Sequence, residues 1–250
     1  MPLSIYAEDI SMMFNLSRNK ETRLKEYVID LVKGKLFFDE FWALQNISFS
    51  LEQGDSLGLI GVNGSGKSTL LKVIAGILTP TKGIIRTHGS IAPLIEISGG
   101  FDRSLSAKEN IFLASAMHRH TRQFTQKRFE SIIDFAELWE FADVPLKNYS
   151  SGMISRLGFA IATLVDADIL IADEVLAVGD VKFRQKCEKR MEEMRRNGTT
   201  VLFVSHSTAQ VKKVCKQALW LEKGKMKMIG DVHSVCDAYE KSLALQKGAL

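Results

Sequence analysis

Residues 61–69 read Gly61-Val62-Asn63-Gly64-Ser65-Gly66-Lys67-Ser68-Thr69, which fits the pattern G-x-x-x-x-G-K-[ST]. An apolar segment at 57–60 leads into this loop, and a helical pattern at 70–75 follows it. Glycines let the backbone curl until successive N–H groups face a polyphosphate, and the following helix adds the positive end of its dipole. The sequence therefore predicts a phosphate-binding loop. Lys67 would bridge the β- and γ-phosphates, and the Ser68 hydroxyl would hold Mg²⁺.

The composition is that of a globular protein. The chain has 250 residues, of which 46 % are hydrophobic and 25 % charged, so a sizeable core is possible. The net charge is +4, but acidic and basic residues interleave over most of the length, so charge alone does not predict nucleic-acid binding. No apolar run approaches the roughly 18 residues of a spanning helix, and no signal-peptide pattern begins the chain. We expect the chain itself to stay in the cytoplasm.

The three cysteines, Cys187, Cys215 and Cys236, have no C-x-x-C spacing. This argues against a disulfide framework or a zinc site, and we expect buried thiols. A charged segment at 182–196 predicts a helix that ends at Asn197-Gly198. Its apolar stripe is interpreted as core packing and comprises Phe183, Cys187, Met191 and Met194.

Short apolar runs indicate an α/β fold with a sandwiched, largely parallel sheet. These runs lie at 47–51, 56–60, 169–172 and 201–204. Between about 101 and 165 the pattern becomes helical. Ser106-Ala107-Lys108-Glu109 is a capping box that opens a helix, and apolar residues at 129–141 have helical spacing. We interpret this middle block as a helical subdomain.

Two adjacent carboxylates, Asp173 and Glu174, end the apolar run at 169–172. Successive side chains of a strand leave opposite faces, so only the strand tip can present both acids to a ligand. In a phosphate-loop ATPase, Asp173 would reach Mg²⁺ directly or through water. Glu174 would orient and deprotonate the attacking water.

A second small-residue loop, Tyr149-Ser150-Ser151-Gly152-Met153, precedes a helical run at 154–164 and forms another candidate anion site. With this loop about 20 residues before the carboxylates, the chain resembles ATP-binding cassette (ABC) proteins over nearly its whole length. Ser150 and Gly152 match the serine and second glycine of the L-S-G-G-Q signature, whereas Tyr149, Ser151 and Met153 depart from it. The resemblance implies an ABC cassette with a RecA-like phosphate-loop core, an antiparallel β subdomain and a helical signature subdomain.

The resemblance also implies an ATPase that works as a head-to-tail homodimer, since one chain carries one set of motifs. Each ATP would lie between the phosphate loop of one copy and the signature of the other. Asp180 matches the D-loop aspartate, and His206 matches the switch histidine that senses the γ-phosphate and acts with Glu174 in catalysis. The implied ATP-binding residues are Phe14, Gly61, Asn63, Gly64, Ser65, Gly66, Lys67, Ser68, Thr69, Ser150, Ser151, Gly152 and Asp180.

Two of the implied site residues depart from the family pattern or depend on alignment. The Q-loop of the family places a glutamine near Mg²⁺, but residues 54–122 contain none, and Glu96 takes its position. The implied metal ligands are Ser68, Glu96 and Asp173. A carboxylate adds negative charge beside the triphosphate, so metal affinity or hydrolysis should differ from that of glutamine-bearing relatives. Phe14 takes the position of the aromatic that stacks on adenine, with Trp42 as the alternative.

Segments at 40–44, 99–101, 149–153 and 173–180 resemble the polysaccharide exporter cassettes that serve O-antigen, capsule and teichoic acid transport. This resemblance implies a separate polytopic permease, a lipid-linked glycan substrate, no nucleic-acid partner, and a peripheral location at the cytoplasmic face of the inner membrane. Some members add a C-terminal carbohydrate-binding domain, which we do not expect in a chain that ends at Leu250. Residues 1–250 would form one nucleotide-binding domain, with its core at about 1–100 and 166–250 and its helical subdomain at about 101–165.

Other interpretations remain open at this point. An ABC ATPase of another exporter class would share the same motifs. A soluble ABC ATPase acting on ribosomes or DNA usually carries two cassettes or a long coiled coil, and a P-loop kinase or GTPase would lack the signature and the switch histidine. The basic segment at 17–35, followed by aromatic residues at 37–42, is either a solvated loop or a surface that meets anionic head groups or the membrane partner.

Overall fold

The computed structural model describes residues 2–15, 40–94, 101–117, 120–164, 167–173 and 180–248. The basic segment at 17–35, Glu96 and Glu174 lie outside these ranges. No helix in the described ranges is both long enough and apolar enough to cross a membrane.

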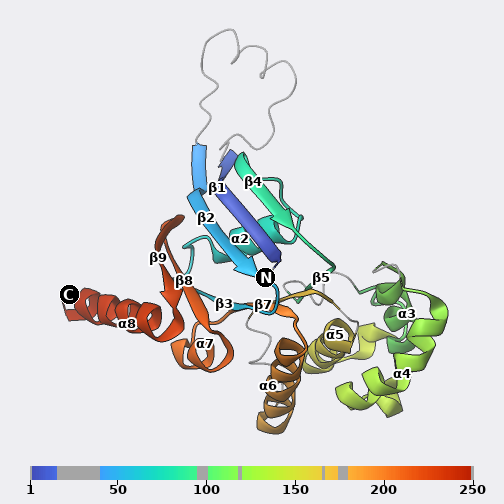
Figure 1. Cartoon of the computed structure of the whole chain (residues 1–250). Helices are drawn as coiled ribbons and strands as arrows, with labels where there is room; N and C mark the ends of the chain where they lie inside the picture. The colour runs from blue at the N-terminus through green and yellow to red at the C-terminus, as the bar shows by residue number, and fades with distance from the viewer. Residues whose placement is uncertain are drawn as a thin grey trace, which may run out of the picture.

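A six-stranded sheet forms the centre of the fold, in the order β5-β6-β7-β3-β8-β9 (Figure 1). Neighbouring strands from β5 to β8 pair in parallel, and β9 pairs antiparallel with β8. The predicted parallel sheet is therefore confirmed for three of its four segments, in β3, β6 and β7. The strands are β3 (Ser56–Ile60), β5 (Ile91–Pro93), β6 (Ile169–Asp173), β7 (Thr200–Val204), β8 (Gln217–Glu222) and β9 (Lys225–Asp231).

The fourth predicted segment, 47–51, belongs to a different sheet. It lies within β2 (Glu40–Glu52), which pairs antiparallel with β1 (Leu3–Asn15), and β1 pairs antiparallel with β4 (Lys82–Thr87). Placing 47–51 in the parallel sheet was wrong, because a short apolar run does not reveal the direction of its partner strand. The resulting antiparallel three-stranded sheet stands above the large sheet in Figure 1.

Both faces of the large sheet are covered at its centre, which explains why β3 and β7 are buried along their whole length. One face packs against β1, β2 and α2 (Lys67–Ile74), through strand residues such as Leu57, Leu59 and Leu202. The alternate strand residues, including Leu170 and Phe203, pack on the other face against four helices. These are α5 (Ser151–Leu164), α6 (Val181–Arg196), α7 (Thr208–Val214) and α8 (Val232–Gly248).

The predicted charged helix is confirmed as α6. Its apolar stripe is buried in the core, and the helix ends before Asn197 and Gly198, where Gly198 has a φ of 91°. The three cysteines are free thiols and buried, as expected. Burial raises the pKa of Cys187 to about 12 and also raises the pKa of Cys215 and Cys236.

The helical region has its own apolar core, formed by α3 (Ala107–Met117), α4 (Arg122–Ala136) and α5, with short 3₁₀ helices η1 (Trp139–Phe141) and η2 (Leu146–Asn148). The capping box is confirmed: Ser106 N donates to Glu109 Oε2 at 2.8 Å, and Glu109 N donates to Ser106 Oγ at 3.2 Å. The helical spacing noted at 129–141 extends past the end of α4, and 139–141 form the separate 3₁₀ helix η1. α4 stops at Ala136 because Glu137 turns into the left-handed region, with a φ of 59°. In Figure 1, α3 and α4 lie on the opposite side of the molecule from α8.

Candidate functional site

The phosphate loop connects the carboxyl end of β3 to the first turn of α2, in the middle of the large sheet. At two of its glycines there is no room for a side chain. A Cβ atom on Gly61 would lie 2.3 Å from Leu221 O, and a Cβ atom on Gly66 would lie 2.7 Å from Ala43 O. Both glycines also have positive φ, at 147° and 106°. The loop therefore needs glycine at the two ends that the motif fixes.

Lys67 lies inside the curl of this loop. Its side chain is buried, and Nζ donates hydrogen bonds to Gly61 O at 2.7 Å and to Val62 O at 3.0 Å. The neighbouring Ser65 hydroxyl is buried and, within the described residues, makes no hydrogen bond. A buried ammonium group held by the carbonyls of a glycine-rich loop, at the start of a helix, is suited to binding anions.

A pocket of about 360 Å³ opens at the loop. It gathers residues from three separate segments: the loop with the start of α2, the strand β2, and the end of β7. Seven of the predicted site residues meet here. The lining consists of Phe41, Ala43, Asn63, Gly64, Gly66, Lys67, Ser68, Thr69, Val204 and His206.

His206 reaches this pocket from a turn after β7 that is held by hydrogen bonds. The Ser205 hydroxyl donates to Gln210 Oε1 at 2.7 Å and accepts from Ser207 N at 3.1 Å, while Ser207 caps the N-terminus of α7. These contacts fix the backbone on both sides of His206, whose own side chain is exposed. The histidine is therefore held at the pocket by its neighbours.

The aromatic residue in the pocket wall is Phe41, and neither Phe14 nor Trp42 is part of the lining. Phe14 lies opposite Phe41 in the β1–β2 pairing and packs against the core between the two sheets. The Trp42 side chain projects from the face of β2 opposite to that of Phe41, and Lys82 Nζ lies 5.3 Å from its ring centroid. Sequence reasoning missed Phe41. The sequence pattern that could have indicated it is the spacing of Phe41 and Ala43, because side chains two residues apart in a strand lie on the same face.

The carboxylate strand ends beside the pocket. Asp173 is the last residue of β6, and its register partner across the ladder is Val204, which lines the pocket. Ser68, which lines the pocket, and Asp173 are residue types that carry hydroxyl and carboxylate oxygens, the donor types that Mg²⁺ prefers, and phosphate oxygens would complete its shell. This donor set fits Mg²⁺. The described part of the chain contains no cluster of three His, Cys, Asp or Glu side chains around a metal position.

The loop from Ser150 to Gly152, the second candidate anion site, does not line this pocket within one copy. Ser150 Oγ accepts a hydrogen bond from Met153 N at 3.2 Å at the start of α5, and Ser150 and Ser151 are exposed. Tyr149 anchors the loop, since its hydroxyl donates to Phe141 O at 2.6 Å. Burial raises the pKa of Tyr149 to about 12, so it remains a neutral donor.

Asp180 caps α6 by accepting from Phe183 N at 2.8 Å, and it also pairs with Arg156 of α5. The hydrogen bond from Phe183 N and the Arg156 guanidinium hold the pKa of Asp180 below its usual value. Arg156 reaches in the other direction to Glu137, at 3.1 Å. Sequence reasoning missed Arg156, because nothing in the spacing of a single arginine indicates its partners.

Comparisons with known proteins agree with this geometry. A family model described as "ABC transporter" matches residues 44–177. The O-antigen export system ATP-binding protein RfbB of Klebsiella pneumoniae is 42 % identical over 214 residues, covering 86 % of this chain and 85 % of the relative. The teichoic acids export ATP-binding protein TagH of Staphylococcus saprophyticus is 40 % identical over 243 residues, covering 97 % of this chain and 90 % of the relative.

Solved structures show the same fold. A dimeric ATP-binding cassette in a post-hydrolysis state with ADP and Pi has a TM-score of 0.74 and 19 % identity, covering 91 % of this chain and 98 % of that one. An ATP-binding subunit of an ABC transporter has a TM-score of 0.76 and 20 % identity, and the match covers 94 % of this chain and 93 % of that one. The predicted cassette architecture is therefore confirmed. Taken with the family match and the phosphate-loop pocket, these likenesses show that the chain belongs to the ABC transporter family, as one of its ATPases.

Proposed function

We propose that this chain is the ATP-hydrolysing subunit of an exporter that carries a lipid-linked polysaccharide, of the O-antigen, capsule or teichoic acid type, across the cytoplasmic membrane. The observation that carries the proposal is identity of about 40 % over 97 % of the chain to a teichoic acids export ATP-binding protein, with a similar match to an O-antigen export protein. The chain would act at the cytoplasmic face of the membrane, beside a polytopic permease. The region at about 101–165 would be the signature subdomain, and the remainder the ATPase core.

ATP would be held by two copies of the chain. Within one copy the loop at 150–152, whose Ser150 and Ser151 are exposed, does not line the phosphate-loop pocket, so a shared site would bring the two together across a dimer. A structural relative was itself solved as a dimer with ADP and Pi. In this arrangement Ser150, Ser151 and the N–H of Gly152 approach the γ-phosphate from the opposite copy, and Asp180 lies at the same interface.

The candidate catalytic and metal-binding residues then have separate roles in hydrolysis. Lys67 stabilises the β- and γ-phosphate charge, and His206 hydrogen-bonds the γ-phosphate. Ser68 and Asp173 would hold Mg²⁺, with Glu96 as a further ligand, and the ion supplies neutralising charge. Glu174 accepts a proton from the water whose oxygen attacks the γ-phosphorus, while the bond to the bridging oxygen breaks and ADP leaves with that oxygen.

Adenine would stack on an aromatic side chain at the base side of the pocket. Phe41 is best supported, because it lines the pocket and is exposed enough to cover a base. Phe14 and Trp42 remain the alternatives.

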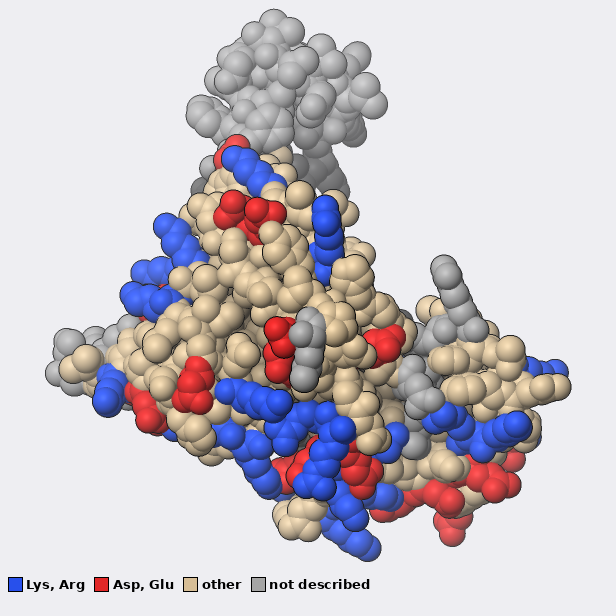
Figure 2. All heavy atoms as spheres, viewed as in Figure 1, with Lys and Arg blue, Asp and Glu red and all other residues tan. Residues whose placement is uncertain are grey.

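The permease would dock on the helical region. Between α3 and α4 lies a pocket of about 550 Å³, lined by Phe112 with the basic side chains of Lys108 and Arg122. Leu113 and Met117 are exposed on the same helix, α3. Figure 2 shows charged side chains of both signs on this lobe, with uncharged surface beside them. Such a mixed surface suits a short amphipathic helix of a membrane protein.

The test is reconstitution. The chain would be co-purified with the polytopic protein encoded beside it and placed in vesicles with lipid-linked polysaccharide, an unrelated drug or metal ions. We expect polysaccharide alone to raise the ATPase rate, and Glu174→Gln to abolish it. Stimulation by the drug or the ions instead would assign the chain to another exporter class. Basal ATPase that responds to ribosomes or DNA would contradict the transport function.

A further inference from the structure

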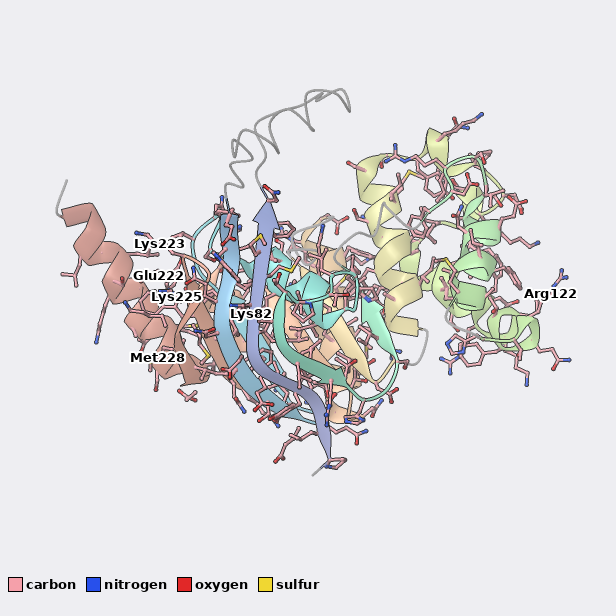
Figure 3. The ribbon with its side chains drawn as sticks, turned by 90° about the horizontal axis from the view of Figure 1, so that it is seen from above. Lys82, Arg122, Glu222, Lys223, Lys225 and Met228 are labelled. Carbon is pink, nitrogen blue, oxygen red and sulfur yellow. The ribbon has the colours of Figure 1, made fainter. Side chains whose placement is uncertain are left out.

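The hairpin between β8 and β9 turns directly against the phosphate loop. Glu222 pairs with Lys225 across the hairpin, so Lys223 and Gly224 form a two-residue turn. Their φ values, 48° and 77°, are both positive, as in a type I′ turn. Figure 3 shows Glu222, Lys223 and Lys225 beside the β2 ribbon, and β2 and β9 are in contact.

Gly224 makes one hydrogen bond to each side of the pocket. Its N–H donates to Ser65 O in the phosphate loop at 3.0 Å. Its carbonyl accepts from Gln45 N in β2 at 2.8 Å. Since β2 also carries Phe41 and Ala43, a single residue ties the phosphate side of the pocket to its base side.

The same contact leaves no room for a side chain. Gly224 is buried, and a Cβ atom there would lie 2.7 Å from Ala43 O and 3.1 Å from Ala43 C. The Cβ position of Gly66 is 2.7 Å from the same Ala43 oxygen and 3.7 Å from Gly224 Cα. Backbone from the turn, the loop and β2 is therefore in direct contact at one point.

We propose that Gly224 is a positioning residue of the ATP site, which sets the distance between the phosphate loop and the base-side wall formed by Phe41 and Ala43. The inference rests on the proposed nucleotide site. ATP must reach both walls at once, so a shift of β2 away from the loop costs contacts to the triphosphate or to the base. A ligand that occupies the loop alone does not require that distance.

The principal variant is Gly224→Ala, and Gly198→Ala is its matched control. Gly198 has a similar φ of 91°, but a Cβ atom there meets nothing within 4 Å, and it lies after α6, outside the pocket lining. Binding is measured for two probes, ATP and inorganic triphosphate, each with Mg²⁺. We expect Gly224→Ala to weaken ATP binding about tenfold and to change triphosphate binding much less. Gly198→Ala should stay within about twofold of wild type for both probes.

Gln45→Pro keeps the test informative if Gly224→Ala does not fold. Proline lacks an N–H, so this variant deletes the bond to Gly224 O without adding bulk at the turn. Gln45→Pro should weaken the binding of ATP more than the binding of triphosphate. It should also speed amide hydrogen exchange in the peptide that covers residues 61–69. Equal losses for both probes would mean that the turn only supports the loop, which overturns the inference, as would unchanged ATP binding in both variants. A wild-type chain that does not bind ATP would instead overturn the proposed function.

Discussion

Arg156 Nη2 donates a hydrogen bond to Asp180 Oδ2 at 3.0 Å, and this pair joins α5, the helix that follows the loop at 150–152, to the start of α6. The guanidinium carbon of Arg156 also lies 4.8 Å from the Phe183 ring centroid. Arg156 Nη1 forms an ion pair with Glu137 Oε2 at 3.1 Å. Lys186 extends the network to Glu137 at 3.2 Å. The network therefore connects α4, α5 and α6 at a point next to two of the implied ATP-contacting segments.

Replacing Arg156 by Met should lower the free energy of unfolding by about 1 kcal/mol, because the cation–π contact with Phe183 and the two partly exposed ion pairs with Glu137 and Asp180 are lost. Urea unfolding measures this change. Asp180→Asn is the partner variant, since asparagine still caps a helix but carries no charge. We expect part of the effect of Arg156→Met to disappear in the Asp180→Asn background. Fully additive effects would mean that the two side chains do not act on each other.

The aromatic that stacks on adenine can be identified by comparing Phe41→Ala, Phe14→Ala and Trp42→Ala. Removing a stacked ring costs about 1 kcal/mol, so the responsible variant should weaken ATP binding about fivefold and leave inorganic triphosphate binding unchanged. We expect Phe41→Ala to behave in this way, because Phe41 lines the pocket. A selective loss in either of the other variants would return the role to that residue.

The buried thiols give a prediction about pH. Burial raises the pKa of Cys187 from 9.0 to about 12, so the folded protein holds this proton where the unfolded chain releases it. A raised folded pKa contributes stability that is present below pH 9 and is lost as pH rises towards 12. The free energy of unfolding should therefore fall over this window, and less so in Cys187→Ala. A thiol reagent at pH 8 should label the native chain slowly and the urea-unfolded chain at all three cysteines.

Local pattern was sufficient for much of this fold. The phosphate loop, the capping box at Ser106 and Glu109, and the buried stripe of α6 each depend on spacing within one segment, and each is present. Segment 47–51 was misplaced because strand direction depends on a partner that is distant in sequence. Phe41 was missed for a related reason. Its position at the pocket depends on how β2 lies against the loop, and Gly224 hydrogen-bonds both of these segments, which are distant from it in sequence.

Shared ATP sites predict complementation between two inactive variants. Lys67→Ala removes the phosphate-loop ammonium, and Gly152→Asp places a negative charge at the loop proposed to meet the γ-phosphate. Each variant alone should form dimers in which both sites are defective. A mixed dimer of the two would carry both defects in one site and leave the other intact, since the proposed site takes its loops from different copies. Random mixing should therefore restore about a quarter of wild-type ATPase activity, because half of the dimers are mixed and each has one working site.

The control is a mixture of Lys67→Ala with the double variant Lys67→Ala/Gly152→Asp, which provides no intact site in any dimer and should stay inactive. Subunit exchange has to be verified by mass spectrometry of the mixed dimers, so that a negative result can be interpreted. If verified mixed dimers hydrolyse no more ATP than this control, the phosphate loop and the loop at 150–152 do not form a site across copies. ATPase activity in the Gly152→Asp homodimer equal to wild type would lead to the same conclusion, because the loop at 150–152 would then be dispensable.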